Sequence, residues 1–189
     1  MRLNLAPAVF FLLSVACVRG SDATDVFWDS LQALCGQAFV GQVVEGTAPG
    51  DDAFRQERLV MEVRSCSETE IRIPLHVGAN RSRTWVLTRT PGGLRLKHDH
   101  RHEDGTEDVV TQYGGDARPG GSAEQQEFPA DKFTAELLPA ARTNVWTISI
   151  KPGQMFGYGL HREAEGRRFR LVFDLRHPVP APPAPWGHE

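Results

Sequence analysis

The segment RRFRLVFDL (residues 167–175) decides the fold class of this 189-residue chain. Its apolar side chains occupy every second position, at Phe169, Leu171, Phe173 and Leu175, and most of the positions between them are charged. Successive side chains of a β-strand point to opposite faces of the sheet, so this period of two predicts a strand with one buried face. A sheet with one charged face and one apolar face is typical of antiparallel pairing.

The same alternation recurs along the chain in RLVMEVR (58–64), EIRIPLHV (70–77), RTWVLTRT (83–90), GLRLKHDH (93–100), EDVVTQYG (107–114), NVWTISI (144–150) and MFGYGLH (155–161). Turn-forming pairs such as Asp104-Gly105 and Pro152-Gly153 separate these segments. The pattern predicts an all-β fold, an antiparallel up-and-down barrel of about eight to ten strands. Two short helices are expected at residues 24–36 and 128–140, and a flexible surface loop at residues 114–127.

The two ends of the chain differ in composition from the middle. Residues 1–20 combine Arg2, an apolar run and small residues before the expected cleavage after Gly20, which is typical of a secretory signal peptide. Acylation at Cys17, as in a bacterial lipoprotein, is an alternative interpretation. Residues 21–176 form the expected barrel domain and residues 177–189 a Pro-rich tail, so we expect an exported protein of the periplasm or the extracellular space.

Charge and motifs exclude several classes of function. Removing Arg2 and Arg19 with the leader changes the formal charge from −3 to −5, and such an acidic chain is not expected to bind nucleic acid. After the leader, no run of apolar residues is long enough to be a transmembrane segment. The chain contains no G-x-S-x-G, H-E-x-x-H or P-loop motif, and no candidate catalytic residues are predicted.

Two cysteines, Cys35 and Cys66, remain after cleavage, and an even pair in an oxidising compartment predicts a disulfide. If Val40 faces Met61 in an antiparallel pair, the same register brings the two thiols together. In that register Phe39 points away from the core.

The order of these segments resembles the calycin group of lipocalin-like barrels. The resemblance consists of a helical turn at residues 24–36, a glycine-containing first strand over residues 36–46 and a meander of strands that follows it. It implies an up-and-down barrel. The N-terminal Gly-x-Trp of that group is not present, because Gly36 is followed by Gln37 and Ala38, so no ligand is carried over.

LRLKHDHRHEDGTEDV (94–109) carries three alternating histidines, His98, His100 and His102, after two alternating leucines. Asp104-Gly105 predicts a two-residue type I′ turn, which would place His98 opposite Thr111 and His102 opposite Glu107. The histidines would then continue the inward row of Leu94 and Leu96 to the mouth of the barrel.

Three interpretations of this row remain open. The histidines are polar residues at a solvated rim, hydrogen-bonded to Thr111, Glu107 and water. Alternatively, His98, His100 and His102 bind a transition metal such as Zn or Cu, with Glu107 or His161 as a further ligand. In the third, a pocket lined by His98, His100, His102, Thr111 and Tyr113 holds a small organic ligand.

We therefore expect an exported, monomeric barrel that binds a small hydrophobic or amphipathic molecule, or a metal ion, at a His-lined mouth. The alternative is an interaction or inhibitor protein that acts through the loops at residues 46–56 and 114–127.

Overall fold

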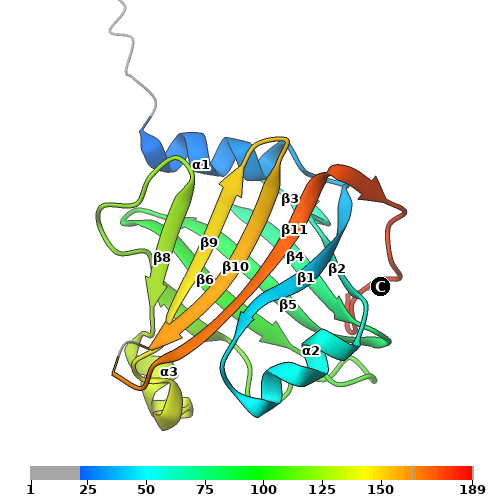
Figure 1. Cartoon of the computed structure of the whole chain (residues 1–189). Helices are drawn as coiled ribbons and strands as arrows, with labels where there is room; N and C mark the ends of the chain where they lie inside the picture. The colour runs from blue at the N-terminus through cyan, green and yellow to red at the C-terminus, as the bar shows by residue number, and fades with distance from the viewer. Residues whose placement is uncertain (1–21, 163, 189) are drawn as a thin grey trace, which may run out of the picture.

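In a computed structural model, residues 22–162 and 164–188 are described, and they form a nearly closed antiparallel β-barrel (Figure 1). The predicted leader, with Cys17, lies outside the described residues. The strands are β1 (Ala38–Gly46), β2 (Leu59–Glu62), β3 (Ser65–Cys66), β4 (Glu70–Val77), β5 (Asn80–Thr90), β6 (Gly93–His100), β7 (Tyr113–Asp116), β8 (Gln125–Pro129), β9 (Val145–Lys151), β10 (Met155–Arg162) and β11 (Arg167–Val179). The helical segments are α1 (Ala23–Gln32), α2 (Asp52–Gln56), α3 (Lys132–Leu137) and the 3₁₀ turns η1 (Pro49–Asp51) and η2 (Pro139–Ala141). No helix among these residues is long and apolar enough to cross a membrane.

The strands form a meander whose first and last members pair with each other. Their order is β7-β6-β5-β4-β2-β1-β11-β10-β9-β8, with β3 added beside β4. At the remaining seam, β7 and β8 are joined by single hydrogen bonds, from Arg118 N to Glu127 O (2.9 Å) and from Asp131 N to Gly114 O (2.9 Å). The predicted all-β antiparallel barrel is confirmed.

The predicted inward rows of β4 and β11 are buried, with Ile71, Ile73, Phe169, Leu171 and Phe173 all at 7% exposure or less. The face predicted for β1 is wrong. Phe39 is fully buried and pairs with Met61, whereas Val40 is 38% exposed. Cys35 follows α1 and does not belong to β1, so the disulfide did not specify the register of that strand.

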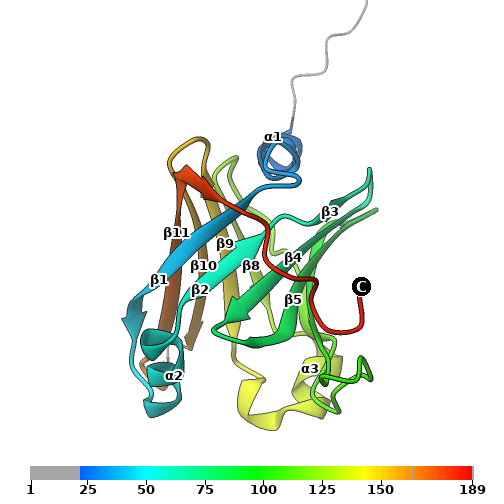
Figure 2. The ribbon, with the colours of Figure 1, turned by 90° about the vertical axis from the view of Figure 1, so that its right-hand side faces the viewer.

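Helix α1 lies across one end of the barrel, and α2 and α3 lie at the other (Figures 1 and 2). Phe27, Trp28 and Leu31 of α1 are at most 1% exposed, so this amphipathic helix seals its end with apolar side chains. The N-cap is Asp22, two residues before the start of the predicted helix, and its carboxylate accepts a hydrogen bond from Thr24 N (3.3 Å).

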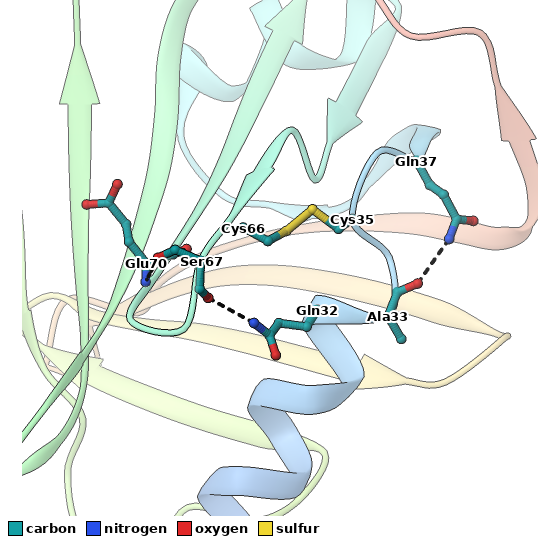
Figure 3. The surroundings of a disulfide bond; sticks show 7 residues. All are labelled: Gln32, Ala33, Cys35, Gln37, Cys66, Ser67 and Glu70. Carbon is teal, nitrogen blue, oxygen red and sulfur yellow. Dashed lines mark hydrogen bonds between the residues drawn. A yellow bond between two sulfur atoms is a disulfide. The ribbon is translucent and has the colours of Figure 1, made fainter.

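The predicted disulfide between Cys35 and Cys66 is confirmed, and it joins the end of α1 to β3 (Figure 3). Gln32 Nε2 donates to Ser67 O (2.8 Å) beside it, as Figure 3 shows. Together these two links hold α1 over the end of the barrel.

Two predictions around residues 114–140 need correction. Residues 114–127 are not one loop, because they include most of β7 and the start of β8. The helix predicted at residues 128–140 corresponds to α3, which is shorter. Phe133 lies on the outer side of α3 with 49% exposure. Its buried residue is Thr134, whose hydroxyl bonds both the N–H (2.7 Å) and the C=O (2.8 Å) of Gly114.

The Pro-rich tail lies against the outside of the barrel and does not close its end. Arg81 Nη1 donates to Ala184 O (2.8 Å), and Trp186 N donates to Arg81 O (3.2 Å). The His188 ring lies 2.8 Å from the Asp99 carboxylate. The run of the tail past β4 and β5 is visible in Figure 2.

Replacing Gly41 with alanine should destabilise the barrel by about 1–3 kcal/mol, because overpacked cores are strained by roughly this amount. A Cβ at Gly41 would lie 2.4 Å from Cε1 of the fully buried Phe173 on β11. Gly50→Ala is the control, since a Cβ there meets no atom within 4 Å. Urea denaturation of both variants tests this, and equal midpoints would contradict it.

Replacing both cysteines with alanine should lower the free energy of unfolding by about 3–4 kcal/mol, since the bond closes a loop with a sequence separation of 31. Thermal unfolding with and without reductant measures the effect. A reductant should lower the melting temperature of the parent protein only, and an unchanged parent would count against the disulfide as a support of the fold.

Candidate functional site

A cavity of about 360 Å³ is lined by residues of the barrel strands and by Asp51, Phe54 and Ala140 from η1, α2 and η2, at the barrel end opposite α1. Much of its wall is apolar and aromatic, from Leu75, Trp85, Trp146, Tyr158 and Phe169. The volume falls in the range of small-molecule sites in proteins, about 300–1,000 Å³. Trp85 and Tyr158 stack with their ring centroids 4.3 Å apart, so one wall is a continuous aromatic surface.

His98 is held in the wall of the cavity by both ring nitrogens. Nδ1 lies 3.0 Å from the carbonyl oxygen of Tyr113, and Nε2 lies 2.8 Å from the Tyr158 hydroxyl. A carbonyl oxygen only accepts, so Nδ1 carries the proton and Nε2 accepts from the Tyr158 hydroxyl. The ring also stacks on Tyr113, with centroids 4.4 Å apart. This imidazole therefore has a fixed position and a fixed tautomer.

His100 lies on the same inward row, nearer the mouth. Its Nε2 shares a hydrogen bond of 3.1 Å with the Tyr113 hydroxyl, and its backbone N–H donates to Thr111 Oγ1 (2.9 Å). His98, His100 and Tyr113 all line the cavity, whereas the Thr111 side chain bonds the backbone of His100 and does not line it.

Burial keeps these groups neutral at physiological pH. It lowers the pKa of the His98 imidazole to about 3. Burial, assisted by the positive charge of Arg83, lowers the pKa of His100 to about 4, and burial raises the pKa of Tyr113 to about 12. The cavity thus presents neutral hydrogen-bonding groups on its His-bearing wall.

The hairpin predicted from Asp104-Gly105 has a different geometry. A type I′ turn needs positive φ at both central residues, and only Gly105 has it (84°). The loop contains three residues, since His102 N donates to Thr106 O (2.8 Å). Residues 109–111 then leave the ladder, and His98 pairs with Tyr113 instead of Thr111.

His102 and Glu107 consequently lie outside the cavity. Both are exposed, and Glu107 pairs with the guanidinium of Arg101 (3.1 Å). His161 faces the outside of β10, because its neighbours Leu160 and Arg162 line the cavity. Within residues 22–162 and 164–188, no group of three His, Cys, Asp or Glu side chains is arranged to hold a metal ion. The four predicted metal ligands are therefore not gathered at one point.

The arginines of the mouth were not predicted from the sequence. Along β5, β10 and β11 the inward row ends in Arg83, Arg162 and Arg167, each two residues from a cavity-lining Trp85, Leu160 or Phe169. The alternation in Arg83-x-Trp85 and Arg167-x-Phe169 is visible in the sequence, but no role was predicted for these arginines. The loop segment that leaves the ladder also brings Val110 to the mouth.

Comparison with known proteins finds no matching family model, no matching curated protein and no matching solved structure.

Stability should fall as the pH drops below 6.5, by about 1.4 kcal/mol per pH unit for each buried histidine that stays neutral. The sign follows from the lowered pKa values of His98 and His100, about 3 and 4. The unfolded chain binds protons at both from pH 6.5 downwards, while the folded barrel binds them only near those lower values.

Urea denaturation between pH 7 and pH 4.5 tests this with His98→Gln. The variant should show a shallower pH dependence than the parent protein, by about 1.4 kcal/mol per unit. His102→Gln, at an exposed position, should keep the parent slope. Identical slopes for His98→Gln and the parent would show that His98 is not buried in its neutral form.

Proposed function

We propose that this protein is an exported binding protein that holds a small amphipathic molecule in the open end of its barrel. The observation that supports this most directly is the cavity itself, with aromatic walls inside and polar side chains at its mouth. A solvated apolar cavity of this size is unfavourable unless a ligand displaces its water, and most small-molecule sites combine apolar walls with a few polar groups. As part of the same proposal, we infer from the barrel architecture that the protein is similar to calycin barrels.

The arrangement of His98 favours binding over catalysis. Both of its nitrogens are engaged by Tyr113 and Tyr158, so the ring has no free lone pair to act as a general base. Its rigid contacts instead shape the cavity wall and leave the Tyr158 hydroxyl oxygen as an acceptor. The disulfide agrees with an exported location, since such bonds persist in oxidising compartments.

Trp85 and Trp146 line the cavity, so ligand binding should change the tryptophan fluorescence of the protein. We expect a saturable change when decan-1-ol is titrated into the delipidated protein. Val110→Phe, at the mouth, should weaken this binding by about tenfold or more, because the larger ring occupies the space in which the ligand lies.

Val109→Phe is the matched control, because the neighbouring Val109 is 83% exposed and does not line the cavity. It should bind decan-1-ol as the parent protein does. Equal loss in both variants, or no saturable signal in the parent, would refute binding in this cavity. If the parent protein binds decan-1-ol and Val110→Phe binds it more weakly, native mass spectrometry of protein purified from the exporting cells identifies the natural ligand by its mass.

A further inference from the structure

The mouth of the cavity carries more positive than negative charge. Its lining contains three guanidinium groups, Arg83, Arg162 and Arg167, and one carboxylate, Asp51. Asp51 is only 3% exposed and is already paired with Arg167 through two bonds of 2.6 and 2.7 Å. The histidines of the lining are neutral, so Arg83 and Arg162 remain as the uncompensated charges.

Among the described residues, the side chains of Arg83 and Arg162 contact neutral partners. Nη1 of Arg83 donates to Asn80 Oδ1 (3.1 Å) and Ser82 Oγ (3.2 Å), and the guanidinium lies 5.4 Å above the ring of Phe54. Nε of Arg162 donates to Asn144 Oδ1. Neither guanidinium forms an ion pair with a carboxylate of the described residues. A guanidinium has five N–H donors, so each retains donors for a further acceptor.

Asp108, a further acid near the His-bearing wall, does not pair with Arg83. The negative charge of Asp108 acts on His100 and Tyr113 in this region. Its carboxylate accepts a hydrogen bond from Val110 N (2.8 Å) and forms no ion pair with Arg83. Arg83 and Arg162 therefore keep charge and free donors that an anion from outside the described chain can bind.

We propose that the ligand is a carboxylic acid with a single apolar chain, whose carboxylate binds Arg83 and Arg162 while the chain lies against Trp85, Trp146 and Tyr158. This inference rests on the proposed function and adds the chemical class of the ligand. The planar fork of a guanidinium matches the two oxygens of a carboxylate, and such charged hydrogen bonds are stronger than neutral ones. The apolar chain then occupies the aromatic interior, where no charge is needed.

The test compares three ligands with the same ten-carbon chain and different head groups. Tryptophan fluorescence titrations of the delipidated parent protein with decanoate, decan-1-ol and decyltrimethylammonium give three dissociation constants. Decanoate should bind at least about tenfold more tightly than decan-1-ol, and decyltrimethylammonium should bind most weakly. Added NaCl should weaken decanoate binding and leave decan-1-ol binding unchanged.

The outcomes separate the two proposals. Binding of decan-1-ol as tight as that of decanoate overturns the inference and leaves the proposed function intact. If none of the three ligands binds, the proposed function itself fails.

The variant Arg83→Gln/Arg162→Gln tests the residues. In this double variant the ratio of the two dissociation constants, decan-1-ol over decanoate, should fall from at least about ten to about one. Arg95→Gln removes a guanidinium from the outer side of β6, where Arg95 pairs with Asp116, and should keep the parent ratio. A double variant that keeps the preference overturns the assignment of the arginines. If it does not fold, the head-group and salt series on the parent protein still decides the inference.

Discussion

The pairing of β1 with β11 is the constraint on which the rest of the structure depends. It joins the first strand of the meander to the last and converts an open sheet into a wall around an enclosed volume. Without it both strands would be free edges, and the inward rows would face solvent. The pairing is irregular, with register shifts between Phe39 and Gly41 and between Val43 and Glu45, and Gly41 leaves room for the ring of Phe173. Closure of the barrel therefore depends on this pairing, on the irregular register within it and on the absence of a side chain at Gly41.

The period of two predicted the barrel and most of its interior, because burial of one face is a local property of each strand. The inward rows of β4 and β11 could be predicted without knowing which strands pair with them. The inward face of β1 could not. The sequence FVGQVV carries apolar residues on both sides, and only the partner strands show that Phe39 points inward. The disulfide was a correct prediction that nevertheless misplaced β1, because Cys35 belongs to the connection after α1.

The positions of the three histidines likewise depend partly on strand pairing and partly on the geometry of the loop. His98 and His100 lie in the cavity because the long ladder with β5 pairs them with Trp85 and Arg83. His102 lies beyond that ladder, and its predicted position depended on a type I′ turn that the loop does not adopt. Asp104 Oδ1 accepts hydrogen bonds from both the N–H (2.9 Å) and the hydroxyl (2.6 Å) of Thr106, and the loop closes around this contact. The alternate spacing of the three histidines therefore places His98 and His100 on the cavity wall and leaves His102 outside it.

The distribution of charge explains how a barrel with this interior can be stable before a ligand arrives. Neutral imidazoles and phenols line the buried part, where a charged group would cost several kcal/mol to desolvate. The guanidinium groups lie at the ends of the inward rows, where water hydrates them when the mouth is empty. An anionic head group exchanges that water for charged hydrogen bonds, and its chain displaces water from the aromatic walls. The arrangement of neutral groups inside and charged groups at the mouth thus permits an empty state and favours the binding of an amphipathic ligand.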